Sequence, residues 1–262
     1  MSSEPRTPEE PSERAVRERL DRVTDPELDE SIVALDYIDD IAVENTKVTV
    51  EFTLPTAWCS PAFAWMMATD ARDEIESLPG VNRAVVRLRE HMHDEEITEG
   101  VNERLTFGET FPDADGGVAD VRATLDEKAR LARQYDAVEA CLGAGLAPDQ
   151  IAKLRLTDIS IDDLVVVFVR EGTVGVSVSP DPVESYLEKA RETGLVADER
   201  PELFRTPEGD PIPPDQFELV HRRCRLAGVN MGGQGSVCEA LNDARHREGR
   251  PPLSPDDHIP EQ

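Results

Sequence analysis

The chain has 262 residues, enough for one large domain or two of ordinary size. Its 55 acidic and 28 basic residues give a formal net charge of −27, which disfavours binding to nucleic-acid phosphates or to anionic lipid. Only four basic residues are lysines, and this composition fits either a protein adapted to molar salt, where repulsion is screened, or an ordinary acidic cytosolic protein.

The chain starts with a polar stretch rich in proline and glutamate, for which we expect disorder over residues 1–12. No signal peptide, lipidation motif or membrane-spanning apolar run is recognisable, so the sequence predicts a cytoplasmic protein without a membrane partner.

Residues 13–93 show the pattern of a small α+β domain. The pattern predicts a helix that ends before Pro26, then a hairpin whose second strand alternates with Val48, Val50, Phe52 and Leu54 facing inward. A second helix follows, with Phe63, Met67, Ala71 and Ile75 at a spacing of four, and then a strand with Ala84, Val86 and Leu88 on one face. This order of helix, hairpin, helix and strand predicts a two-layer α/β sandwich.

The second half of the chain is predicted to be mostly helical. Residues 94–118 are acidic and contain glycine, which indicates a linker with about one turn of helix. A domain over 119–249 would begin with a long amphipathic helix and contain a β-hairpin. We interpret the glycine-rich stretch 230–236 as a loop, because it lacks the lysine of a phosphate-binding loop, and 250–262 as a disordered tail.

The stretch "TLPTAWCSPAFAWMM", residues 53–67, places Cys59 where a strand gives way to a helix. A helix start stabilises a thiolate through the helix dipole and free backbone N–H groups, and Pro61 suits the first turn. The position fits a reactive or metal-binding sulfur, although a packed structural cysteine fits it too. The other cysteines, Cys141, Cys224 and Cys238, show neither zinc-knuckle spacing nor a disulfide framework, and buried thiols are expected for most.

Four segments in order resemble the small iron-sulfur cluster assembly domain of the SufT/PaaD type: "DPEL" (25–28), "SIVALDYIDDIAV" (31–43), "VTVEFTLPTAWCSP" (48–61) and "LPGVNRAVVRL" (78–88). The resemblance implies a role in assembling or delivering iron-sulfur clusters, with the family's cysteine at Cys59 and its acidic loop at Asp25 and Glu27. It also implies that Thr56 belongs to the site. The sequence departs from the family at Asp36, where a glycine is usual, and this puts the local turn geometry in question.

A cluster site usually has about four thiolate ligands, so one junction cysteine suits transient holding. Other ligands would come from a second subunit in a homodimer, a partner or a small thiol, and Cys238 is a second candidate metal ligand. The "EHMHDEE" segment offers another conceivable metal site, because His91 and His93 would share a face if the strand continued; a solvated strand end is the alternative. Asp25 and Glu27 could likewise serve only to form a turn.

Parts of the second half resemble the catalytic domain of tyrosine recombinases, from "AGLAPDQIAKLRLTDIS" to "HRRCRLAGV". The family's functional residues do not carry over: Ala147 stands near the first arginine, and no tyrosine follows Tyr186. We therefore expect a non-catalytic docking module.

The sequence thus predicts a non-enzymatic maturation factor that holds iron or an iron-sulfur cluster through Cys59. It would dock a client metalloprotein, such as a metal-dependent oxygenase, or other cluster-assembly proteins. Two alternatives are a regulatory or DNA-associated protein that uses the recombinase-like half, and a redox enzyme with Cys59 as nucleophile.

Overall fold

The computed structural model describes residues 11–114, 117–161, 164–169, 172–197 and 202–248, except for the side chains of 232–239 and 243–248 in the last helix. It divides into one unit of residues 1–122 and 234–262 and a second unit of residues 123–233. The predicted disordered ends lie outside the described residues, apart from residues 11 and 12; Ser12 caps the first helix by accepting from the Ala15 N–H at 3.1 Å.

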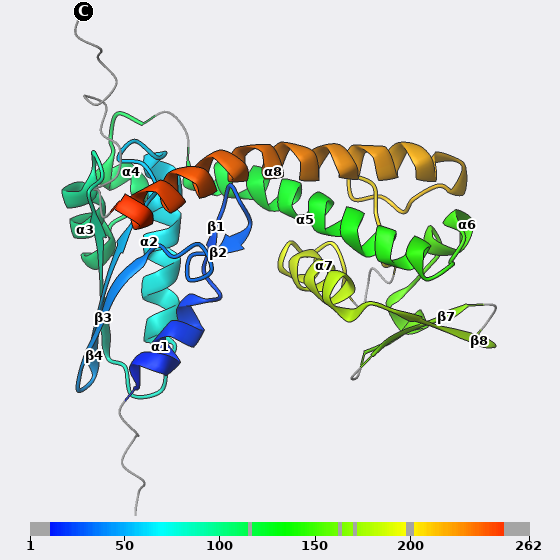
Figure 1. Ribbon diagram of the computed structural model, residues 1–262, viewed down its shortest axis with the longest axis horizontal. Coiled ribbons are helices and arrows are strands. Elements are labelled where there is room, and N and C mark those ends of the chain that lie inside the picture. Colours follow the sequence, from blue (N-terminus) through cyan, green and yellow to red (C-terminus); the bar gives the residue numbers. More distant parts are fainter. Residues whose placement is uncertain (1–10, 115–116, 162–163, 170–171, 198–201, 249–262) are drawn as a thin grey trace, which may run out of the picture. The chain divides into compact units, whose positions relative to one another are not determined.

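A three-stranded sheet of order β3-β4-β5 forms the centre of the first unit (Figure 1). β3 (Ile38–Glu44) pairs antiparallel with β4 (Lys47–Thr53), and β4 pairs parallel with β5 (Arg83–Arg89). Parallel pairing requires a crossover, which α2 (Pro61–Glu76) provides. The predicted inward face is confirmed, since Val48, Val50, Phe52 and Leu54 are all at most 1% exposed, whereas Thr53, expected to face outward, is buried as well.

The helices α1 (Glu13–Leu20) and α2 cover one face of this sheet. α1 contacts both α2 and β3 and buries Val16 and Leu20 in the same core. The short strands β1 (Thr24–Asp25) and β2 (Glu30–Ser31) pair antiparallel, and β1 lies against α2. At Asp36 the backbone φ is +57°, in the left-handed region that favours glycine, so the aspartate adopts the turn geometry that was in question. The predicted α+β fold is confirmed.

The stretch predicted as a linker instead contains two helices, α3 (Asp94–Asn102) and α4 (Phe107–Thr110). α3 buries Ile97 and Val101 in the core and covers the open edge of β5. The Asn102 side chain donates to the Val86 carbonyl at 2.7 Å and accepts from the Val86 N–H at 3.0 Å, and Thr98 Oγ1 accepts from the Leu88 N–H at 3.1 Å. These side chains take the place of a further strand, because they bond to backbone groups at the edge of β5 that another strand would otherwise pair with. The acidic composition indicated a linker because only two apolar side chains of α3, Ile97 and Val101, stand among its acidic residues.

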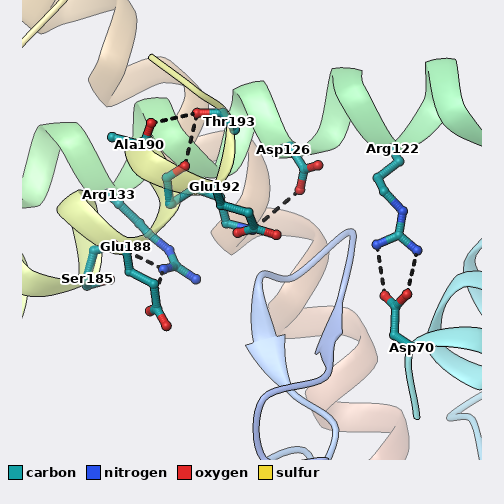
Figure 2. A network of polar contacts seen from close by, with 10 residues as sticks. Asp70, Arg122, Asp126, Arg133, Ser185, Glu188, Ala190, Glu192 and Thr193 are labelled. Carbon is teal, nitrogen blue, oxygen red and sulfur yellow. Dashed lines mark hydrogen bonds and ion pairs between the residues drawn. The ribbon is translucent and has the colours of Figure 1, made fainter. Parts of the chain in front are cut away.

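The second unit packs helices with a three-stranded antiparallel sheet of order β6-β7-β8. Its elements in chain order are α5 (Val118–Gly143), α6 (Pro148–Ile151), η1 (Leu156–Asp158), β6 (Ile159–Ile161), β7 (Val165–Val169), β8 (Val174–Val178), α7 (Pro180–Glu192), η2 (Pro214–Gln216) and α8 (Phe217–Glu248). Polar contacts tie α7 to α5. Arg133 donates to the Ser185 carbonyl at 3.0 Å (Figure 2), and Lys189 Nζ lies 3.4 Å from Asp126 Oδ1. The predicted long helix and hairpin are present, and β6 adds a third strand.

The glycine-rich stretch 230–236, predicted as a loop, lies inside α8. The prediction was wrong because each glycine costs a helix only about 1 kcal/mol relative to alanine, and the residues on both sides continue the helix. The division between the units falls within α8 and within α5. No helix among the residues that the structure describes is long and apolar enough to cross a membrane.

Candidate functional site

Cys59 lies in the loop between β4 and α2, one residue before the cap of the helix. Its N–H donates to the Thr56 carbonyl at 3.4 Å, which closes the loop. The Ser60 carbonyl then accepts from the N–H groups of Phe63 and Ala64, at 2.9 and 3.1 Å, and starts α2. Pro61 occupies the first turn, where no N–H is required, so the predicted junction is confirmed.

A histidine from a distant part of the chain holds this loop in place. His91 Nε2 lies 2.8 Å from the Cys59 carbonyl oxygen, and His91 Nδ1 accepts from the His93 N–H at 3.1 Å. Because Nδ1 is an acceptor, the proton of the neutral ring is on Nε2, which donates to Cys59. A further bond, from the Met92 N–H to the Ala57 carbonyl at 2.8 Å, ties the two loops together.

The environment of His91 keeps its ring neutral. Only 6% of the residue is exposed, and burial lowers the pKa of His91, although the hydrogen bond to the Cys59 carbonyl opposes this shift. Both ring nitrogens are occupied, so this arrangement leaves none for a metal ion.

The two histidines therefore do not form the metal site that was considered, and the alternative of a solvated strand end does not describe His91 either. β5 ends at Arg89, His91 is buried, and His93 caps α3 with its Nδ1 3.4 Å from Glu96. The role of His91 was missed, because 32 positions and a crossover helix separate it from Cys59 and no spacing rule connects them.

Asp25 builds the turn that precedes the sheet. Its Oδ1 accepts from the N–H groups of Glu27 and Leu28, at 2.8 and 3.3 Å, and its Oδ2 accepts from the Tyr37 hydroxyl at 3.3 Å. Burial raises the pKa of Asp25, while these hydrogen bonds oppose the shift. The turn-forming role that was the alternative is thus present. Glu27 lies half-buried on the same turn, and β1, which contains Asp25, contacts α2.

The cysteines differ in exposure. Cys59 is half-buried and packs at the edge of the first core, whereas Cys141 and Cys224 are each 1% exposed within the second unit. Burial raises the pKa of Cys141 and of Cys224 to about 11, so both remain thiols at neutral pH. None of these three is in a disulfide. Cys238 lies in α8 among the side chains outside the described part, so the structure does not place it relative to Cys59.

Within the described ranges, no group of three histidine, cysteine, aspartate or glutamate side chains is arranged to hold a metal ion. Near the start of α2 the described residues therefore provide one partly buried cysteine, Cys59, on a loop fixed by hydrogen bonds. One thiolate can bind a metal but cannot complete a cluster site that needs about four ligands.

The comparison with known families concerns the part of the chain that contains this site. Residues 13–86 match the family model described as iron-sulfur cluster assembly protein. The match runs from α1 into β5 and includes Asp25, Glu27, Thr56 and Cys59. No curated protein matches the chain.

This match covers less than half of the chain, and it supports an iron-sulfur cluster assembly domain at the N-terminus and a general role in cluster assembly. It supports the corresponding part of the predicted resemblance. The SufT/PaaD subtype and the recombinase-like second half stay predictions. His91 lies beyond the matched residues, so the contact that fixes the loop comes from the structure alone.

Proposed function

We propose that the protein is a non-enzymatic maturation factor that holds iron or an iron-sulfur cluster through Cys59 and passes it to a client metalloprotein. The observation that carries this proposal is the position of Cys59, which is only partly buried and lies just before α2, inside the segment that matches the cluster assembly family. The iron or cluster is in this view the cargo of the protein and not a resident cofactor.

The position favours a thiolate that can bind metal. The first N–H groups of a 16-residue helix and its dipole stabilise negative charge on a sulfur just before the helix. The buried Cys141 and Cys224 lack this advantage, because burial favours their neutral thiol. Cys59 is therefore the described thiol best suited to bind iron at neutral pH.

A single protein thiolate also suits release. Because the remaining ligands must come from a second subunit, a partner or a small thiol, replacing them frees the cargo. The hydrogen bond from His91 to the Cys59 carbonyl fixes the backbone beside the sulfur, so the loop need not order when a client arrives. Thr56 contributes through its carbonyl, and Asp25 and Glu27 through the turn that adjoins α2.

In this proposal the second unit binds the client protein. The transfer takes place in the cytoplasm. Two of its arginines, Arg130 and Arg205, are at most 4% exposed and donate to carbonyl groups within the unit. These two guanidinium groups are turned inward and do not offer charge to a phosphate backbone, which gives no support to the DNA-associated alternative.

A transfer assay tests the proposal. Protein loaded anaerobically with iron, sulfide and a small thiol is mixed with an apo-ferredoxin as acceptor, and the rate of cluster appearance in the acceptor is measured. We expect the wild type and a Cys141→Ala control to transfer the cluster, and Cys59→Ser to transfer it no faster than the small thiol alone. Equal transfer by the wild type and Cys59→Ser would refute the assignment of Cys59.

A further inference from the structure

A pocket of about 490 Å³ opens in the first unit at the start of α2, next to the loop that carries Cys59. Its walls are mainly apolar: Ala62 from α2, Phe107 and Phe111 at the two ends of α4, and Val118 and Val121 from the first turns of α5. His93, Glu96 and Asp113 add polar groups to its lining. The volume is in the usual range for a ligand pocket, and apolar walls beside two carboxylates suit apolar groups with a cationic neighbour.

The walls of this pocket are held by specific contacts. The Trp65 ring packs edge-to-face against both phenylalanines of the wall, with its ring centroid 5.8 Å from that of Phe107 and 6.4 Å from that of Phe111. Next to Val121 in the chain, Arg122 of α5 forms two hydrogen bonds, of 2.8 and 3.0 Å, with the carboxylate of Asp70 in α2 (Figure 2). A pocket with such supports exists before a ligand arrives, which lowers the entropic cost of binding.

Two large apolar side chains are exposed beside the pocket. Trp58 is 40% exposed and Met92 is 58% exposed. The Met92 N–H bonds the carbonyl of Ala57, so the two side chains belong to loops that are tied together. Ser60 and His93, which line the pocket, follow Trp58 and Met92 closely along the chain. Tryptophan and methionine are enriched where proteins bind one another, and here they flank Cys59.

The surroundings are strongly acidic. From Glu90 to Asp113 the sequence contains eight acidic residues and one arginine, and that arginine, Arg104, is paired with Glu76. Glu90, Glu95 and Glu96 are exposed around Met92 and the pocket. A partner with lysine or arginine next to its apolar side chains would be attracted and oriented by this field. A second copy of the chain would bring the same acids to a symmetric contact and be repelled.

We infer that the pocket together with Trp58 and Met92 is a docking surface at the Cys59 site itself, in addition to the client contact proposed for the second unit, and that it binds a segment of the partner protein with apolar side chains flanked by lysine or arginine. This inference rests on the proposed function, since a docked segment would lie beside the thiol that releases the cargo. The apolar side chains enter the pocket between Phe111 and Val121, and the basic residues face Glu95 and Glu96.

The test uses the full chain and a synthetic peptide that has leucine and phenylalanine between pairs of lysines. One control peptide replaces the lysines by glutamates, and another replaces leucine and phenylalanine by alanines. Trp58 and Trp65 are the two tryptophans of the chain, one in the exposed surface and one packed against the pocket wall, so their indole NMR signals report binding directly. We expect both signals to shift with the first peptide and with neither control.

Two variants locate the binding. Trp58→Ser and Glu96→Lys should each lower the affinity for the first peptide by about tenfold or more. Loss of an aromatic anchor, or of a charge that faces the partner, has this effect at interfaces. Leu219→Asp, a change at a 54% exposed residue of the second unit, should leave the affinity unchanged. Cys59→Ser should also bind the peptide with unchanged affinity. A loss of metal binding can then be distinguished from a loss of peptide docking.

Three outcomes would overturn the inference. Indole signals that do not move, or that move equally with the alanine peptide, would exclude an apolar docking site. Unchanged affinity in Trp58→Ser would place the binding elsewhere. Sedimentation that shows a dimer, lost in Trp58→Ser, would mean that this surface binds a second copy.

Discussion

Replacing His91 with phenylalanine isolates the contact that fixes the Cys59 loop. The ring size is nearly kept, but the Cys59 carbonyl and the His93 N–H both lose their partner. An orphaned buried polar group costs about 1–3 kcal/mol, and because both residues are half-buried, water can reach them and the lower end applies. We therefore expect His91→Phe to lower the free energy of unfolding of the first unit by about 2 kcal/mol.

Tryptophan fluorescence during denaturation measures this loss, because Trp58 and Trp65 both lie in the first unit. His93→Gln is the matched control: the His93 contact with Glu96 involves two partly exposed side chains, so its loss should cost at most about 0.5 kcal/mol. Alkylation of Cys59 should also become faster in His91→Phe, since the loop is released. An unchanged midpoint together with an unchanged alkylation rate would show that His91 does not hold the loop.

Three further predictions concern stability. Gly100→Ala should lower the free energy of unfolding of the first unit by about 1–3 kcal/mol, because a Cβ there would lie 2.8 Å from the Trp65 ring. Gly108→Ala, with open space around its Cβ, should leave it unchanged, and equal urea midpoints for the two variants would contradict the close packing at Gly100. Burial raises the pKa of Asp25, so the wild type should lose stability relative to Asp25→Asn as pH rises from about 4 through the folded-state pKa; a difference independent of pH would show that the carboxylate is not destabilised. The denaturation midpoint should rise from low to molar salt, because the charge of −27 is then screened, and a flat or falling midpoint would remove the argument for adaptation to salt.

Local patterns predicted the elements of the first unit well. The alternation around Val50 fixed which side of β4 is buried, and the spacing from Phe63 to Ile75 predicted α2. Each of these two patterns arises because one face of a single strand or helix packs against the core. Such a pattern is local, so it can be recognised in one sequence. The position of Cys59 at the junction followed from the same patterns and from the resemblance.

Features that depend on contacts between distant segments were not predictable in this way. The bond from His91 to the Cys59 carbonyl joins a loop after β5 to a loop before α2, and only the crossover of the fold brings them together. α3 was missed because its two buried apolar side chains, Ile97 and Val101, stand among acidic residues. The continuous α8 was missed because glycine weakens a helix without forbidding it. In each case tertiary packing outweighs local composition.

Iron content is the measurement that tests the central claim most directly. Wild-type protein and Cys59→Ser are reconstituted anaerobically with ferrous iron, sulfide and a small thiol, desalted, and analysed for iron and sulfide per chain, with Cys141→Ala as the control. The account predicts bound iron in the wild type and in the control, and none above background in Cys59→Ser, which should remain folded because serine and cysteine differ little in volume. Equal iron and sulfide in the wild type and in Cys59→Ser would contradict it.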